Sequence, residues 1–222
     1  MYRLYHYPIC PFSRKIRVLL TEKKLSFFPV VENFWERREK YIRLNPMANV
    51  PMIIAKPDLV ISDSQAIAEF LEEEHPNISL IPGSPQDRAE IRRTIAWFDG
   101  KFYDEVVAFV LNEKVYNFFK TGADPDHELL KIARQNLSYH MRYLQFLIAK
   151  RNWIAGDELS LADITAACHL SSLDYLGEIN WNNYPVAKEW YAIIKSRPSF
   201  RDILQDMLSG FRPAPHYREL DF

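Results

Sequence analysis

The segment around Cys10 combines residue types that favour thiol chemistry. Cys10 and Pro11 stand where a short apolar run gives way to a helical pattern, and Arg14 and Lys15 follow within that pattern. Backbone N–H groups at a helix start are unpaired and the helix dipole is positive there, so a thiolate is stabilised and its pKa falls. The sequence therefore predicts a reactive thiol at Cys10; the alternative is a cysteine that fills a small apolar slot. Ser13 is a second candidate nucleophile, although a serine here also suits a helix N-cap.

The Val50-Pro51 pair lies at the start of an extended run. Cis peptide bonds occur almost only before proline, so this bond is a candidate cis peptide. A cis bond would turn the Val50 backbone outward, leaving its N–H and C=O groups free to pair with an extended peptide. The alternative is an ordinary proline at a sheet edge.

Asp63 and Ser64 lie between an apolar run and the next helical pattern. The free N–H groups around Ser64 would form a site for a carboxylate, and Asp63 can accept hydrogen bonds from an ammonium group. The free end of an α-amino acid carries both of these groups. The alternative is that Asp63 or Ser64 is only the cap of the helix.

These residues must be positioned by the elements of the first quarter of the chain. Period-two runs predict strands, and apolar residues at helical spacing predict helices. The strands are expected at 2–7, 27–31, 50–55 and 59–62, and the helices at 13–23, 35–44 and 64–74. The order βαβαββα predicts a small sheet flanked by helices, an α/β domain over residues 1–76.

The rest of the chain is predicted to be all-α. Residues 77–86 hold two prolines and a glycine and no periodicity, and we expect the domain linker there. Helical patterns follow at 87–119, 128–150, 161–176 and 186–196, which predicts a helical domain over 87–209. A tail over 210–222 has two prolines, three Phe or Tyr residues and no period.

Composition narrows the classes of partner. The chain has 222 residues with 48% hydrophobic and 26% charged side chains, enough for two compact domains. Its 28 basic and 29 acidic residues give a net charge of −1, which argues against nucleic acid as a partner. No apolar run approaches the roughly 20 residues of a membrane span, so none is expected. Arg3, Arg14 and Lys15 would interrupt a signal peptide, so we expect a cytoplasmic protein.

The cysteines and histidines point to no metal. Cys10 and Cys168 are far apart and are expected to be reduced, with Cys168 in the core. The six histidines, His6 among them, show no metal-ligand spacing.

The motifs together resemble the two domains of cytosolic glutathione transferases. Leu44-Asn45-Pro46, Val50-Pro51 and Asp63-Ser64-Gln65-Ala66-Ile67 are similar to that family's glutathione-binding domain. The stretch from Ala155 to Asp163 resembles the family's capping box, in which Ser160 caps a buried helix and Asp163 reciprocates. The resemblance covers residues 2–200 and implies a thioredoxin-like domain followed by a helical domain.

The resemblance also implies roles for the candidate site residues. Cys10 falls at the catalytic position of the cysteine-type and serine-type classes. Val50 would bind the cysteinyl part of glutathione through its backbone, with Pro51 as the cis proline, and Asp63 and Ser64 would hold the γ-glutamyl end. Glutathione is thus the expected co-substrate, together with an unidentified electrophile or disulfide, and a homodimer is the expected state.

Two departures limit the resemblance. Asn49 stands where many members carry a longer Lys or Gln that reaches the glycyl carboxylate. A cysteine at position 10 can form a mixed disulfide, which suits thiol transfer, but Ser13 takes the place of a resolving cysteine. A thiol-transfer cycle would therefore use Cys10 alone and a second glutathione.

An aromatic segment and the tail favour a second function. Trp35 opens an otherwise charged helical pattern, where it could pack beside a ligand or form a protein contact. Phe211 and Phe222 belong to the tail, which could pack back on the domains or be presented as a peptide. The two segments together are similar to a bacterial subgroup of transferase-like adaptors that bind the tubulin-like cell-division polymer. The alternative function is therefore a non-catalytic adaptor that binds this polymer through Trp35, Phe211 and Phe222.

Overall fold

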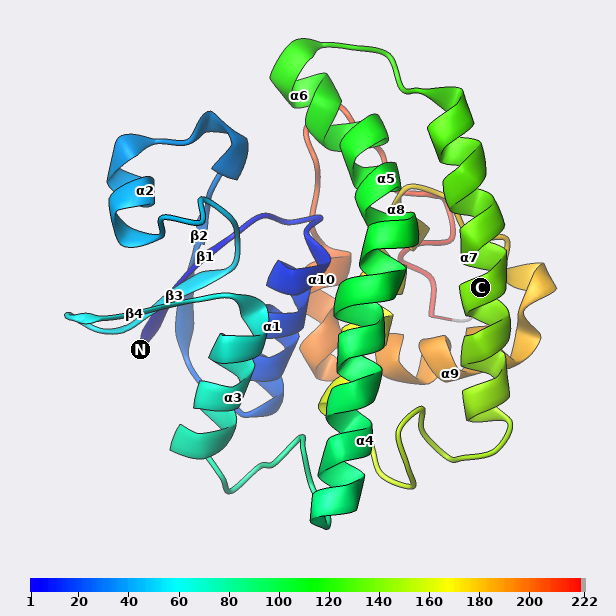
Figure 1. Ribbon diagram of the computed structural model, residues 1–222, viewed down its shortest axis with the longest axis horizontal. Coiled ribbons are helices and arrows are strands. Elements are labelled where there is room, and N and C mark those ends of the chain that lie inside the picture. Colours follow the sequence, from blue (N-terminus) through cyan, green and yellow to red (C-terminus); the bar gives the residue numbers. More distant parts are fainter. Residues whose placement is uncertain (221–222) are drawn as a thin grey trace.

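Two parts of the chain lie side by side in the computed structural model, which describes residues 1–220 (Figure 1). The first part holds a four-stranded sheet in the order β2-β1-β3-β4. Strand β1 (Tyr2–His6) runs parallel to β2 (Phe27–Val31) and antiparallel to β3 (Met52–Lys56), which pairs with β4 (Leu59–Ser62). Strand β3 begins after Pro51, because proline has no N–H to give to a sheet.

Three helices flank the sheet: α1 (Pro11–Glu22), α2 (Glu39–Leu44) and α3 (Ser64–Glu74). Helices α1 and α3 contact each other, and their apolar residues are buried with those of the central strands. The prediction of one helix over 35–44 is wrong at its start. Phe34–Glu36 form a 3-10 turn, and Arg37 follows with a left-handed backbone (φ 49°) that breaks the helix before α2.

The second part is helical. A long rod begins with α4 (Pro85–Ala96), and its further helical turns are α5 (Ala108–Leu111) and α6 (Asn117–Thr121). Between these turns the rod is π-helical, at Trp97–Val107 and Asn112–Tyr116. The remaining elements are α7 (His127–Ile148), α8 (Leu161–Tyr175), α9 (Pro185–Lys195) and α10 (Arg201–Leu204), with 3-10 turns at Trp181–Asn183 and Pro198–Phe200.

Helix α8 is the centre of the helical part, since every residue of it is buried. The predicted capping box at its start is confirmed. The Ser160 N–H donates to Asp163 Oδ2 at 3.0 Å, and the Ser160 hydroxyl accepts from the Ala162 N–H at 3.3 Å. Asp163 also accepts from the N–H of Ile154 and the indole of Trp190, so one carboxylate joins the helix to two neighbouring segments.

Helix α1 packs against α8 and joins the two parts of the chain. Lys15 of α1 forms a buried ion pair with Asp99 of the rod, whose other oxygen lies 3.0 Å from His169 Nε2 of α8. Cys168 is fully buried beside this contact, as predicted for a core cysteine. The predicted fold class, a thioredoxin-like domain followed by a helical domain, is confirmed.

The tail folds back on the helical part as far as it is described. The Ala214 N–H donates to the Tyr175 carbonyl at 2.9 Å, the Tyr175 hydroxyl donates to the Phe211 carbonyl at 2.8 Å, and Tyr217 is fully buried. Of the two alternatives for the tail, packing back on the domains is what these contacts show for residues 211–217. Phe222 lies outside the described residues. Within residues 1–220, none of the helices combines the length and the apolar character that crossing a membrane requires.

Candidate functional site

Cys10 lies at the start of α1, where the sequence predicts it. It is the N-cap residue, and its thiol donates to the Val50 carbonyl, with Sγ 3.7 Å from the oxygen. Only 5% of Cys10 and 6% of Val50 is exposed to solvent. The thiol is thus enclosed by protein and engaged as a donor.

The predicted low pKa of Cys10 is wrong. Burial raises the pKa of the thiol above its ordinary value, because a thiolate loses its hydration in the interior. Hydrogen bonds from the start of α1, at Ser13 and Phe12, lower the pKa but do not overcome burial. The protonated thiol is therefore the form expected at neutral pH.

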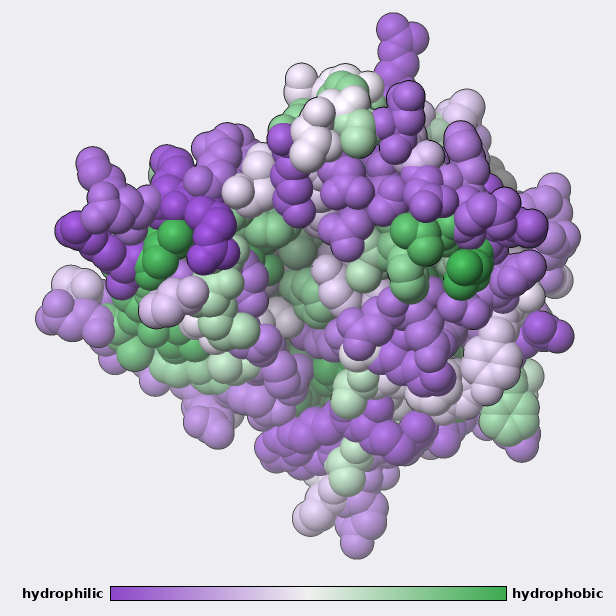
Figure 2. All heavy atoms as spheres, turned by 45° about the horizontal axis from the view of Figure 1, so that its top comes forward, coloured by the Kyte–Doolittle hydropathy of each residue, from purple (hydrophilic) through white to green (hydrophobic). Residues whose placement is uncertain are grey.

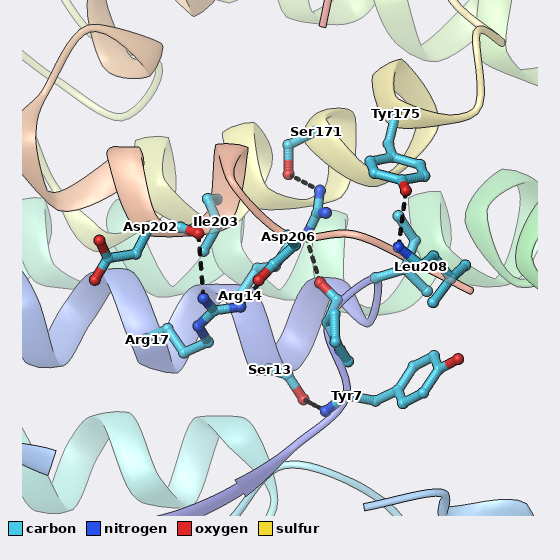
Figure 3. Close-up of polar contacts among 12 residues, drawn as sticks. Tyr7, Ser13, Arg14, Arg17, Ser171, Tyr175, Asp202, Ile203, Asp206 and Leu208 are labelled. Atoms are coloured by element: carbon cyan, nitrogen blue, oxygen red, sulfur yellow. Dashed lines mark hydrogen bonds and ion pairs between the residues drawn. The ribbon is translucent and has the colours of Figure 1, made fainter. Parts of the chain in front are cut away.

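Arg14 and Lys15, the two basic residues that follow Cys10, make buried polar contacts with other segments. Arg14 is fully buried; its Nε donates to the Pro8 carbonyl at 2.8 Å and its Nη1 to Ser171 Oγ at 2.9 Å (Figure 3). Lys15 is paired with Asp99. Arg14 lowers the pKa of Cys10 only as the smallest of the contributions, so the predicted positive field is weak at the sulfur.

Ser13 lies inside the first turn of α1 and is fully buried. Its hydroxyl accepts a hydrogen bond from the Tyr7 N–H at 3.2 Å (Figure 3). The prediction that Ser13 is an N-cap is wrong, because Pro11 starts the helix two residues earlier and leaves Cys10 as the cap. Ser13 instead fixes the loop between β1 and α1.

The Val50–Pro51 peptide bond is cis, which confirms the prediction. Asn49, just before it, is tied into its own loop. Its carbonyl and its side-chain oxygen both accept from Asn45 Nδ2, at 2.8 and 3.0 Å. The Asn49 amide is thus engaged within the protein at the position where many transferases extend a longer side chain.

Asp63 and Ser64 lie at the same end of the sheet as Val50. Met52 pairs with Ser62 and with Tyr5, so the start of β3 lies beside the ends of β1 and β4. Asp63 is the N-cap of α3, and its Oδ1 accepts from the N–H groups of Gln65 and Ala66 at 2.7 and 3.3 Å.

The backbone of Asp63 and the burial of Ser64 are two further features of this end of the sheet. The backbone of Asp63 has φ 76° and ψ 130°, which is strained for any residue but glycine, and such strain is concentrated at functional sites. Ser64 is only 4% exposed. The two bonds to Oδ1 show that Asp63 caps α3, which was one of the two roles left open for it. This role uses one of its two carboxylate oxygens.

Aromatic side chains of the rod lie near Cys10. Tyr103 lies against Phe12 with ring centroids 4.6 Å apart, and Tyr116 lies 6.0 Å from Tyr7. The Cys10 charge also raises the pKa of both Tyr103 and Tyr116, second to burial, which is consistent with their nearness to the sulfur. Figure 2 shows apolar atoms at the floor of the groove between the two parts of the molecule, with hydrophilic side chains on both sides.

Trp35 is partly buried and packs against aromatic residues of both parts of the molecule. Its ring stacks on Phe119 of α6 at 5.6 Å with an interplanar angle of 11°, and it meets Tyr7 edge-on at 4.8 Å. Phe119 in turn lies 5.7 Å from Phe211 of the tail. We call Trp35, Phe119 and Phe211 the aromatic bridge. It brings together the two described residues that the sequence proposes for partner binding, and the exposed Phe118 lies 5.3 Å from Phe211.

Sequence reasoning missed Phe119, Tyr103 and Tyr116. All three belong to a helical pattern rich in aromatic residues, where core positions and cleft positions have the same spacing. Tyr103 and Tyr116 lie in π-helical turns of the rod, which a propensity argument does not foresee.

The fold and this site define the class of protein. Residues 4–80 match the N-terminal domain family of glutathione S-transferases, and residues 64–192 match the C-terminal domain family. The chain belongs to the glutathione S-transferase family, and it is a glutathione transferase-like protein.

Three known proteins match this chain over all or nearly all of their length. FtsZ-localized protein A of Caulobacter vibrioides is 40% identical over 222 residues, covering 99% of this chain and 97% of the relative. The crystal structure of a glutathione S-transferase from Rhodospirillum rubrum F11 is 46% identical with a TM-score of 0.96, and both chains are covered completely. The structure of FzlA from C. crescentus is 40% identical with the same TM-score, covering 100% of this chain and 99% of that one.

Proposed function

We propose that this chain is a non-catalytic, transferase-fold protein that binds FtsZ, the tubulin-like cell-division polymer. The observation that carries the proposal is the state of Cys10. Its thiol is enclosed, it donates to the Val50 carbonyl, and burial raises its pKa, whereas transfer chemistry needs an accessible thiolate. The similarity to FtsZ-localized protein A over the full chain supports the choice of partner.

The binding surface in this proposal is the aromatic bridge with Phe118. Phe118 is 49% exposed, while Trp35 holds it in place through Phe119. Aromatic residues in the centre of an interface often contribute about 2 kcal/mol or more. In the proposal the protein works in the cytoplasm as a homodimer.

Co-sedimentation with FtsZ polymers tests the proposal. Phe118→Ala and Trp35→Ala should each weaken association by more than about tenfold, and Cys10→Ala should leave it unchanged. Phe28→Ala is the matched control, because Phe28 is an equally exposed phenylalanine (55%) on β2. Failure of the unaltered protein to sediment with the polymer, or loss of binding in Cys10→Ala alone, would contradict the proposal.

A second candidate is glutathione-dependent thiol transfer at Cys10. The observation in its favour is that Cys10, Val50 and the cis Pro51 are gathered at one end of the sheet, beside Asp63 and Ser64. The Cys10 thiolate would attack the glutathione sulfur of a substrate–glutathione disulfide, releasing the substrate thiolate and leaving a mixed disulfide of Cys10 with glutathione. A second glutathione thiolate would then attack the glutathione sulfur of that mixed disulfide, forming glutathione disulfide and restoring the Cys10 thiolate.

Calorimetric titration of glutathione and of glutathione disulfide separates the two candidates. Thiol transfer requires binding of at least one of them and turnover that is lost in Cys10→Ala. Asn49, Val50, Pro51, Asp63 and Ser64 are the residues that would hold the tripeptide, so Ser64→Ala should weaken the binding. Absence of binding at millimolar concentration would remove this candidate and leave the first intact.

A further inference from the structure

The polar contact between α1 and the rod is narrow. Helix α1 packs chiefly on α8, to which Arg14 also donates a hydrogen bond through Ser171. Toward the rod, the ion pair of Lys15 and Asp99 is the one polar contact of α1 that the structure shows within residues 1–220. The seating of the rod on α1 therefore depends on this pair and on the apolar side chains around it.

Asp99 uses both of its carboxylate oxygens. Oδ2 accepts from the Lys15 ammonium, and Oδ1 lies 3.0 Å from His169 Nε2. Burial raises the pKa of Asp99, but the Lys15 charge and the His169 bond hold it below its ordinary value. Burial lowers the pKa of His169, so the ring is neutral and its Nε2–H donates to the carboxylate. One ionised side chain thus joins α1, the rod and α8.

The same junction borders Cys10. Phe12 follows Cys10 by two residues, and its ring contacts Tyr103 of the rod at 4.6 Å and His169 of α8 at 5.3 Å. Asp99 and Tyr103 belong to the same π-helical turn of the rod, and such turns are frequent at functional sites. The bond that fixes Asp99 against α1 therefore also fixes how closely Tyr103 approaches Cys10.

We propose that the Asp99 carboxylate is a clamp that seats the rod on α1 and thereby keeps the Cys10 thiol closed to solvent. The Lys15 side chain is fully buried and that of Asp99 is only 16% exposed. Loss of the carboxylate leaves a buried ammonium without its partner, and the α1–rod contact then opens to let water reach it. The clamp acts on access to Cys10, whichever of the two candidate functions holds.

Site-resolved thiol labelling tests the clamp. Asp99→Asn removes the charge, but its amide oxygen can still accept from His169, so the contact with α8 is retained. Iodoacetamide should modify Cys10 at least about tenfold faster than in the unaltered protein, because a local opening exposes it. Cys168, which is fully buried in α8, should label no faster, and mass spectrometry of the two cysteine peptides reads both rates.

Asp104→Asn is the matched control, because it makes the same change at an exposed residue of the same π-helical turn. It should leave Cys10 labelling within about twofold of the unaltered protein. Below the unfolding transition, urea should change the Cys10 rate in Asp99→Asn only slightly, since a local opening exposes little surface.

A double-mutant cycle tests whether the ion pair itself is the clamp. Lys15→Met removes the other charge and should also speed the labelling of Cys10. If the two residues act through each other, the double variant Lys15→Met/Asp99→Asn should label less than about twofold faster than the faster single variant. Effects that multiply in the double variant would show that the two residues act separately, which contradicts the clamp.

Two further results would overturn the inference. The first is Cys10 labelling in Asp99→Asn that is no faster than in the unaltered protein. The second is labelling of Cys10 and Cys168 that rises together and steeply with urea, because Asp99 would then support the whole fold and not the closure of Cys10.

Discussion

The Sγ atom of Cys10 lies 3.7 Å from the carbonyl oxygen of Val50, the residue before the cis Pro51. A thiol can donate to a carbonyl oxygen, but a thiolate cannot, so ionisation of Cys10 would remove this contact. It would also place a negative charge in a site from which water is excluded. The same contact that joins the start of α1 to the β3 loop therefore opposes the formation of a nucleophile.

Cys10 should react slowly with thiol reagents in the native protein. Because burial raises its pKa and shields the sulfur, labelling by iodoacetamide at pH 7 should be slower than labelling of a free cysteine peptide. The pH–rate profile, with Cys10→Ser to identify the modified residue, measures this. A native rate above that of the peptide would show that the groove opens in solution.

Replacing Arg14 should destabilise the contact between the two domains. The guanidinium is fully buried and satisfies the Pro8 carbonyl and the Ser171 hydroxyl, with the rings of Tyr175 and Tyr217 about 6 Å away. Arg14→Met fills similar space but leaves the Pro8 carbonyl without this donor, while the Ser171 hydroxyl keeps its bond to the Cys168 carbonyl, so the expected cost is about 1–3 kcal/mol in unfolding free energy.

Urea denaturation compares this variant with Arg201→Met, at an exposed residue of α10, which should change the unfolding free energy by less than about 0.5 kcal/mol. Equal stability of the two variants would mean that the buried guanidinium contributes nothing net.

His6 should make the protein sensitive to acid. Burial, and secondly the charge of Arg17, lower the pKa of His6 to about 3 from an ordinary value near 6.5. Between these values the unfolded chain binds a proton that the folded protein excludes, so stability falls as pH drops below 6.5. The slope from this one group is at most about 1.4 kcal/mol per pH unit.

His6→Phe keeps an aromatic ring at this buried position of β1 but cannot take up a proton. Denaturation between pH 4 and 7 should show a shallower loss of stability in this variant than in the unaltered protein. Parallel curves for the two proteins would show that His6 is not the group that titrates.

The order of the elements could be predicted from the sequence, whereas the state of the site could not. Pro51 at the start of an extended run and the Ser160–Asp163 capping box act within a few residues, and both are confirmed. The pKa of Cys10 depends instead mainly on burial, which arises from segments that meet only in the folded chain, such as the loop of Val50. The helix-start argument for Cys10 is correct in direction, but the burial that outweighs it is a tertiary effect.

For the tail as well, the local structure could be predicted from the sequence but the tertiary contacts could not. Prolines and the absence of a period favour an irregular segment over 210–222, which residues 210–220 are. The sequence alone could not decide between a docked and a presented tail. That choice depends on tertiary contacts, among them the one between His216 Nε2 and Asp174, a buried carboxylate of α8, at 2.8 Å.

The docking of the tail should therefore weaken as pH rises. The hydrogen bond to Asp174 raises the pKa of His216 above its ordinary value; among the described residues, the charge of Lys195 lowers it and that of Glu219 raises it. A raised pKa in the folded state stabilises that state below the ordinary histidine range, and the contribution is lost as pH rises through the raised value. Amide hydrogen exchange at Ala214, whose N–H is bonded to the Tyr175 carbonyl, reports on the docked tail.

After correction for intrinsic rates, the protection of this amide should be greater at pH 5.5 than at pH 8.5 in the unaltered protein. His216→Gln keeps a side chain that can donate to Asp174 but carries no charge, so its protection should be lower at pH 5.5 and should not depend on pH through this group. If His216→Gln retained the full pH dependence of the unaltered protein, the His216–Asp174 pair would not be what holds the tail.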